Sequence, residues 1–124
     1  VIMYELFPLE SDEVRSAVAT YERVFSSSQG SPGVPRYEND TYYRKDPNSL
    51  GNWWIITTLW TAQYYTLINQ PERSKAILNW VKQHTGDSGI LPEQIEPGSL
   101  NFISVAPLIW SHAEYVSTLL DAAE

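Results

Sequence analysis

The stretch NWWIITTLWTAQYYTLI, residues 52 to 68, carries no charged side chain and is apolar on nearly every face of a helix. A helix of this composition is stable only when it is buried on all sides. Asn52 is a residue type that caps helix N-termini, so we predict that the helix begins there. The rest of the chain must therefore supply the cover for an inner helix.

Three other segments have helical periodicity. Residues 11–25 predict an amphipathic helix capped by Ser11 or Asp12. Residues 69–86 predict a second amphipathic helix that begins at Pro71, ends at Gly86 and buries a stripe made of Ala76, Ile77, Trp80 and Val81. Residues 106–124 predict a helix that begins at Pro107 and is again largely apolar, with Leu108, Ile109, Ala113, Val116, Leu119 and Leu120 on its surface. This last segment is the second candidate for an inner helix.

Outer amphipathic helices thus alternate with inner apolar ones, and two long loops precede the inner helices. This alternation favours an all-α fold of two concentric helical layers, such as a toroid of helical hairpins. A four-helix bundle would instead show one stripe on every helix and short connections. Four helices cannot close a ring, so the ring is either incomplete in this chain or replaced by a small bundle.

The composition of the chain excludes some classes of binding partner. The 124 residues carry a formal charge of −7, which repels the phosphates of nucleic acid and anionic lipid, so we expect neither nucleic acid nor a membrane as a partner. The longest apolar stretch is shorter than the roughly 20 residues that span a bilayer. Cysteine is absent, so the cellular compartment stays open. Aromatic residues make up 13% of the chain, which suits sugar binding or simply a core.

Four strings lie in the two loops and at the starts of the inner helices: GVPRYENDTYY (33–43), GNWW (51–54), GILPEQ (89–94) and SVAPLIWSHAEYV (104–116). In this order they resemble the C-terminal part of the catalytic domain of glycoside hydrolase family 15, the glucoamylases and glucodextranases. The resemblance covers most of the chain from about Gly33, and we interpret residues 1–124 as that C-terminal portion. It implies an (α/α)6 barrel, incomplete in this chain, and hydrolysis of α-glucosidic bonds with inversion.

The resemblance also implies site residues. Glu93 matches the general base, and Pro92 before it restricts the local backbone. Arg36 and Asp40 match residues that bind the hydroxyls of the terminal glucose. Trp54 and Trp110 match aromatic residues of the sugar site, although Trp53 replaces the family's proline. Ser104 matches a serine that hydrogen-bonds the base.

No residue matches the family's general acid, which lies upstream. Inversion places the two carboxyl groups about 6.5–9.5 Å apart, so the acid should come from another hairpin. We therefore interpret the chain as a fragment of an inverting glucoamylase-like hydrolase. Its expected partners are the upstream part of the barrel and a substrate that is an α-glucan or a maltooligosaccharide. Whether the fragment is itself an enzyme stays open. The alternative is a non-catalytic helical module, derived from the same fold, that binds sugar or protein.

Less specific interpretations remain for several of these residues. Arg36 and Asp40 could form an ordinary loop salt bridge. Trp60 and Trp80 are expected in the core, and we assign to His112 and Glu114 either a structural role or the support of residues that contact the sugar. His84 and His112 are the only histidines, so we predict no metal and no cofactor. An incomplete barrel should expose apolar faces of its inner helices, which predicts a homodimer or domain swapping.

Overall fold

The computed structural model describes residues 6–25 and 31–123. The chain divides into two compact units, Val1–Pro32 and Gly33–Glu124. The first unit contains α1, Asp12–Phe25. Ser11 caps this helix, because its Oγ accepts a hydrogen bond from Val14 N–H at 3.3 Å, as predicted.

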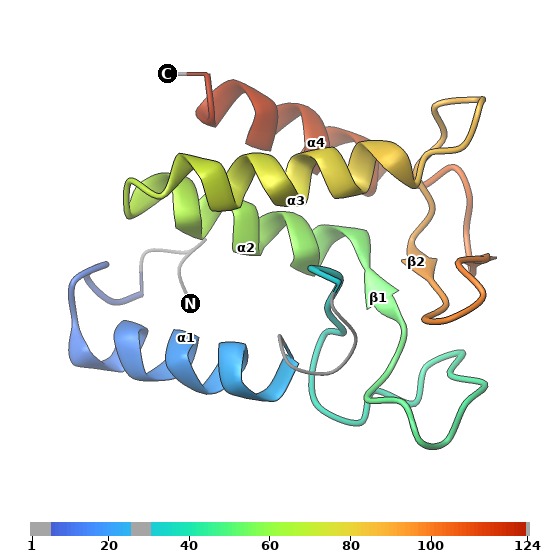
Figure 1. Ribbon diagram of the computed structural model, residues 1–124, viewed down its shortest axis with the longest axis horizontal. Helices are drawn as coiled ribbons and strands as arrows, with labels where there is room; N and C mark the ends of the chain where they lie inside the picture. Colours follow the sequence, from blue (N-terminus) through green and yellow to red (C-terminus); the bar gives the residue numbers. More distant parts are fainter. Residues whose placement is uncertain (1–5, 26–30, 124) are drawn as a thin grey trace. The chain divides into compact units, whose positions relative to one another are not determined.

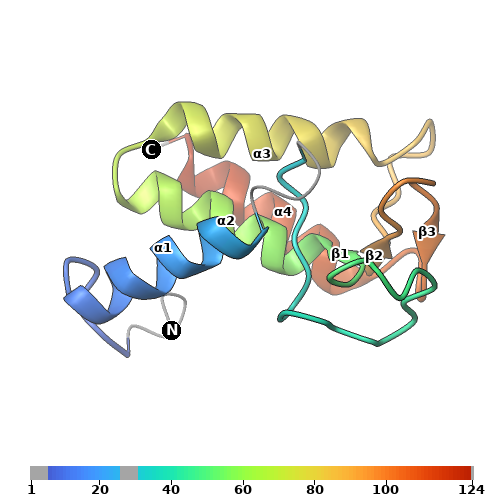
Figure 2. The ribbon, with the colours of Figure 1, turned by 60° about the horizontal axis from the view of Figure 1, so that its bottom comes forward.

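The second unit contains three helices: α2, Ile55–Leu67; α3, Pro71–Gln83; and α4, Ile109–Asp121. They lie side by side in both ribbon views, and α2 packs against both α3 and α4 (Figures 1 and 2). A short turn joins α2 to α3, so these two run in opposite directions. The central position of α2 provides the cover that its apolar sequence requires.

Most of α2 is buried, as its apolar composition predicts. Ile55 and Leu59 are fully buried, and polar positions of the helix, Thr58 and Gln63, are buried as well. The core cluster joins α2 to α3 and to the loop strands through Trp53, Ile55, Leu59, Leu78, Val81, Leu91 and Ile95. Trp80 is partly buried and packs against this cluster, in agreement with its expected place in the core.

A small antiparallel sheet corrects the all-α prediction. It consists of β1, Trp53–Trp54; β2, Gln94–Ile95; and β3, Phe102–Ile103, in the order β1-β2-β3. The register places Trp53 opposite Ile95 and Ile95 opposite Phe102. The strands gather at the end of the unit where α2 begins (Figure 2). The sheet ties together the loops that precede the two helices predicted to be inner.

The sheet also moves the start of α2. We expected the helix to begin at Asn52, but Trp53 and Trp54 are extended and Trp54 stands at the N-cap without a side-chain cap. Asn52 instead donates from Nδ2 to Gln94 Oε1 at 3.0 Å and to the Tyr43 carbonyl at 3.2 Å. Its side chain joins two loops, which a cap could not do.

Helix α3 begins at Pro71 as predicted, but its ending and its buried face differ. The helix ends at Gln83 rather than at Gly86, although Gly86 follows in the left-handed region with φ +61°. The buried stripe is Ser74, Ile77, Leu78 and Val81. Ala76, which we placed in that stripe, is exposed. The stripe is therefore rotated from the predicted one.

Helix α4 differs most from its prediction. It begins at Ile109, two residues after Pro107, with Leu108 at the N-cap. Its buried residues are the small polar Ser111 and Thr118, while Tyr115 and Ala122 pack against the core cluster. The apolar residues that we expected to be inside are exposed: Ile109, Ala113, Val116, Leu119 and Leu120. Within the described residues, α4 therefore has one covered face and one open apolar face.

Candidate functional site

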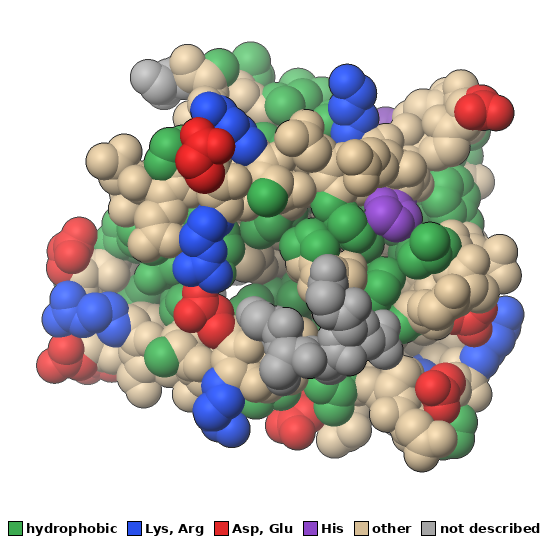
Figure 3. All heavy atoms as spheres, viewed as in Figure 1, with side chains coloured by type: hydrophobic (Ala, Val, Ile, Leu, Met, Phe, Trp, Pro, Cys, Tyr) green, Lys and Arg blue, Asp and Glu red, His purple; other side chains and the backbone are tan. Residues whose placement is uncertain are grey.

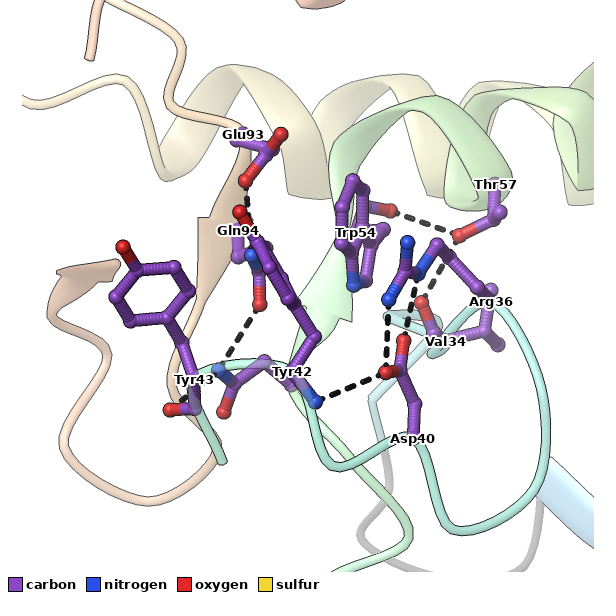
Figure 4. Close-up of polar contacts among 10 residues, drawn as sticks. Val34, Arg36, Asp40, Tyr42, Tyr43, Trp54, Thr57, Glu93 and Gln94 are labelled. Carbon is purple, nitrogen blue, oxygen red and sulfur yellow. Dashed lines mark hydrogen bonds and ion pairs between the residues drawn. The ribbon is translucent and has the colours of Figure 1, made fainter. Parts of the chain in front are cut away.

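The first turn of α2 holds the loop that carries Arg36. Trp54 N–H donates to the Val34 carbonyl at 2.9 Å, and Val34 N–H donates to Thr58 Oγ1 at 3.1 Å. Thr57 Oγ1 also donates to the Val34 carbonyl, at 3.1 Å (Figure 4). Polar residues inside an otherwise apolar helix are thus used to fix a loop, which places Arg36 next to Trp54.

Arg36 and Asp40 form a bidentate ion pair within this loop. Arg36 Nε and Nη2 donate to Asp40 Oδ2 and Oδ1 at 2.8 and 2.9 Å. Asp40 Oδ1 also accepts a hydrogen bond from Tyr42 N–H at 3.1 Å. Asp40 is fully buried, whereas 34% of the Arg36 side chain is exposed. The salt bridge is therefore present, and it leaves Arg36, rather than Asp40, facing the solvent.

Two opposing effects set the charge of Asp40. Burial raises the pKa of its carboxyl, but hydrogen bonds from Arg36 and from Tyr42 N–H, with the positive charge of Arg36, hold the pKa below 3.8. The hydrogen bond between Arg36 and Asp40 raises the pKa of Arg36, and the negative charge of Glu93 adds a smaller effect in the same direction. The pair is thus ionised at neutral pH, and Glu93 lies close enough for Arg36 to sense its charge.

Aromatic rings surround the Arg36 guanidinium. Its Cζ lies 4.1 Å from the centre of the Trp54 ring, 5.1 Å from that of Tyr42 and 5.4 Å from that of Tyr37. Such stacking fixes the plane of the guanidinium. Nε and Nη2 point to Asp40, so the donors of Nη1 remain for another acceptor. The close-up view shows Arg36 between Trp54 and Asp40 (Figure 4).

The glycine that opens GNWW is needed for this packing. Gly51 has a backbone φ of +134°, which residues with a side chain rarely adopt. A Cβ at this position would lie 3.0 Å from both Asp40 Cβ and the Asp40 carbonyl oxygen. Asp40 N–H in turn donates to the Leu50 carbonyl at 3.1 Å. The close approach of the two loop segments buries Asp40.

The backbone of Glu93 is held from both sides. Its N–H donates to the Val105 carbonyl at 2.8 Å, and its carbonyl accepts from Ile55 N–H at 3.2 Å. The residues before it are held by α4, since Leu91 N–H donates to His112 Nε2 at 3.0 Å and Ser111 Oγ donates to the Pro92 carbonyl at 2.8 Å. Proline alone is therefore not the source of the rigidity that we predicted here.

The side chain of Glu93 has a partner that the sequence analysis missed. Gln94 Nε2 donates to Glu93 Oε2 at 2.9 Å, and Gln94 Oε1 accepts from Asn52 (Figure 4). Gln94 is fully buried and Glu93 is partly exposed. The chain Asn52–Gln94–Glu93 orients the carboxylate and leaves Oε1 without a hydrogen bond from the described residues. The signal was the glutamine beside Glu93 in the quoted string GILPEQ.

Ser104 lies beside the residue that binds the Glu93 backbone, at an exposed position with φ +66°. The hydrogen bond to the Glu93 carboxylate comes from Gln94, and the Ser104 hydroxyl makes none with it in the described part of the chain. The role we predicted for Ser104 therefore stays a prediction.

Trp110 belongs to a second cluster, between α2 and α4. Its indole is half exposed and lies 6.2 Å from that of Trp60, centre to centre. Both indole N–H groups donate to Glu114, from Trp60 at 3.1 Å and from Trp110 at 3.2 Å. Trp60 is only partly buried, so its predicted place in the core is met in part. Arg36, Asp40, Trp54 and Glu93 form the first cluster, and their sharing of one sugar with Trp110 stays a prediction.

Within residues 6–25 and 31–123, His, Cys, Asp and Glu form no group of three or more that could hold a metal ion. His112 accepts a hydrogen bond from the backbone of Leu91, as expected of an interior histidine. Over the same residues, every helix is too short or too polar to cross a membrane. Lys and Arg side chains are interspersed with Asp and Glu on the face seen in Figure 3.

Comparison with known proteins gives matches over most of the chain. No family model matches. A Methanocaldococcus jannaschii protein named as an uncharacterized glycosyl hydrolase is 29% identical over 126 aligned positions, which cover 91% of this chain and 19% of that protein. A solved glycosidase superposes with a TM-score of 0.79 over 99% of this chain, at 22% identity. A second solved structure, named as a point variant of a glycosidase, gives the same values.

These matches place the fold among glycosidases without identifying the reaction. The chain spans 34% of the solved glycosidase and 19% of the M. jannaschii protein, so both contain a large part that this sequence does not. The names of the relatives support a glycosidase-like family.

Proposed function

We propose that this chain is the C-terminal part of the catalytic domain of an inverting α-glucosidic hydrolase, similar to glycoside hydrolase family 15. The remainder of an (α/α)6 barrel would lie upstream and supply the general acid. The observation that carries the proposal is the position of Glu93, whose peptide group is held on both sides while Gln94 orients its carboxylate. A base that must aim a water molecule needs this kind of support.

In this proposal Glu93 acts through the oxygen that Gln94 leaves free. Oε1 takes a proton from a water molecule as the water oxygen forms its bond to the anomeric carbon. The upstream acid gives a proton to the glycosidic oxygen as the bond from that oxygen to the anomeric carbon breaks. The configuration at the anomeric carbon is inverted, and both carboxyl groups then exchange their protons with solvent.

Arg36 is the proposed contact to the sugar hydroxyls. Its stacked and ion-paired guanidinium presents Nη1 in a fixed direction, which suits a hydroxyl oxygen as acceptor. Because Asp40 is buried and its oxygens are engaged, we propose that it acts by holding Arg36 in place. Trp54 supports the other face of the guanidinium.

The test is a substitution at Glu93 in the natural full-length protein, assayed with maltooligosaccharides. Glu93→Gln should lower kcat by about 10²- to 10⁴-fold, the usual contribution of a general base. Nuclear magnetic resonance of the first product formed should show the β-anomer of glucose. A matched control is Glu96→Gln, since Glu96 lies in the same loop and pairs with Lys45 at 3.7 Å.

Full activity in Glu93→Gln would remove this residue from the mechanism, and an α-anomeric product would rule out inversion. Binding of maltooligosaccharides without hydrolysis in the full-length protein would support the alternative of a non-catalytic sugar-binding module. The preferred linkage and chain length are left open, because the upstream loops would set them.

A further inference from the structure

The carboxylate of Glu114 is the centre of a hydrogen-bond cluster between α2 and α4. Oε1 accepts from Trp60 Nε1 and from Gln63 Nε2, each at 3.1 Å, and Oε2 accepts from Trp110 Nε1 at 3.2 Å. Gln63 Nε2 also donates to Thr118 Oγ1 at 2.9 Å. Three donors from two helices therefore fix one carboxylate.

This cluster determines which part of the Trp110 side chain is available to contact a ligand. The one polar atom of its side chain donates to Glu114, and the same holds for Trp60. The half-exposed ring of Trp110 can therefore offer only its apolar surface. Aromatic faces of this kind stack on the C–H faces of sugar rings. To donate a hydrogen bond to a sugar hydroxyl, the Trp110 indole would have to break its hydrogen bond to Glu114.

The cluster is also tied to the loop that carries Glu93. Ser111 and His112, the two residues after Trp110, bind the Pro92 carbonyl and the Leu91 N–H. The first turn of α4 thus holds the candidate base from one side and presents Trp110 on the other. Any movement of Trp110 relative to this turn is limited by its bond to Glu114 one turn later.

We infer that Glu114 is a positioning residue, which holds the indoles of Trp60 and Trp110 so that the Trp110 ring stacks on a sugar unit of the substrate. The inference rests on the proposed function, because it takes the ligand to be a carbohydrate. It adds a role for Glu114 and Trp60, whose carboxylate and indole do not touch the sugar. The effect of Glu114 on binding must therefore pass through Trp110.

The experiment is a double-mutant cycle in the natural full-length protein, with maltotriose as the substrate. Glu114→Gln keeps the shape but turns an N–H donor toward one of the indole N–H groups. We expect KM to rise roughly threefold to tenfold with little change in kcat, as for the loss of one hydrogen bond that supports binding. In a Trp110→Phe background the same change should leave KM unaltered.

Two controls make the outcome specific. Glu72→Gln removes a surface carboxylate on α3 that pairs only with Lys75, at 3.2 Å among the described contacts, and should change neither constant. Trp60→Phe removes one donor and keeps the carboxylate, so it should raise KM in the same direction and serves if Glu114→Gln does not fold.

The inference is overturned if Glu114→Gln and Trp60→Phe leave KM unchanged, or if Glu114→Gln raises KM equally with and without Trp110. That result leaves the proposed function intact when Glu93→Gln is inactive. If the unaltered protein neither binds nor hydrolyses maltooligosaccharides, the proposed function itself falls, and the role of Glu114 falls with it.

Discussion

Helices α2 and α4 have similar apolar sequences, but their surroundings differ. Ile55 and Leu59 of α2 are fully buried, while Ile109 and Leu120 of α4 are 83% and 64% exposed. Helix α4 turns Ser111 and Thr118 toward the rest of the unit and leaves its apolar residues outside. The apolar pattern thus shows that a surface requires cover, but it does not show whether this chain contains the cover.

The exposed apolar face of α4 agrees with the fact that this chain spans only part of the length of its relatives. The chain corresponds to 34% of the solved glycosidase whose fold it shares. Monomers rarely leave apolar patches of more than a few hundred Å² in contact with water. We therefore propose that the open face of α4 is covered by the upstream part of the barrel in the full-length protein. A chain of residues 1–124 alone would cover it by self-association.

Truncating one leucine in each helix gives the largest expected contrast. Leu59→Ala should lower the free energy of unfolding by about 2–5 kcal/mol, because it leaves a cavity at a site with no exposed surface. Leu120→Ala, the matched change in α4, should cost less than about 0.5 kcal/mol in residues 1–124. Urea unfolding followed by circular dichroism measures both, and equal losses would break the comparison.

The starts of the two helices differ in charge, and acid should separate them. The start of α2 rests against the Arg36–Asp40 ion pair, whereas the start of α4 binds its loop through the hydroxyl of Ser111 and the imidazole of His112. The folded pKa of Asp40 lies below 3.8, so its contribution to stability is complete above about pH 4. It is lost as the pH falls through the folded pKa.

Asp40→Asn should remove this part of the acid dependence. At pH 7 it should cost about 1.5–3 kcal/mol, the range for hydrogen bonds to charged groups. The measurement is the free energy of unfolding in urea at pH 3, 5 and 7. If Asp40→Asn loses as much stability between pH 5 and pH 3 as the unaltered protein does, other carboxyl groups dominate the acid response.

The smallest expected effect on stability is at the open face of α4. Ile109→Lys should change the free energy of unfolding by less than about 0.5 kcal/mol, because the residue is largely exposed. It should nevertheless shift residues 1–124 from dimer toward monomer in light scattering at high concentration. A wild-type chain that stays monomeric there would contradict the predicted self-association.

Local signals in the sequence predicted much of the fold. Pro71 and Ser11 mark helix starts because their effect acts within one turn. The strand at Trp53–Trp54 could not be predicted in the same way, since its partners Val34 and Ile95 lie far away in the sequence. Asn52 was taken for a cap because its true partner, Gln94, is 42 residues away.

The candidate site was predicted in part for the same reason. Arg36 and Asp40 are four residues apart, so their pairing was visible as an alternative in the sequence. The support of Glu93 by Val105, Ile55 and Gln94 depends on the folded sheet, which no short string encodes. The carboxylate of Glu114 joins donors 51 and 54 residues away, so its structural or supporting role was predicted without the partners that define it.

Noncovalent contacts, and not only the covalent chain, hold the segment that ends in α4 to the loop that carries Glu93. Besides Ile55 and Gln94, the groups that hold Leu91, Pro92 and Glu93 lie beyond the exposed turn at Gly98 and Ser99; they come from Val105, Leu108, Ser111 and His112. A protease that nicks this turn would cut the covalent path while the noncovalent contacts persist. The two pieces should then behave as complementing peptides, and the geometry around Glu93 should survive the break and vanish only when they dissociate.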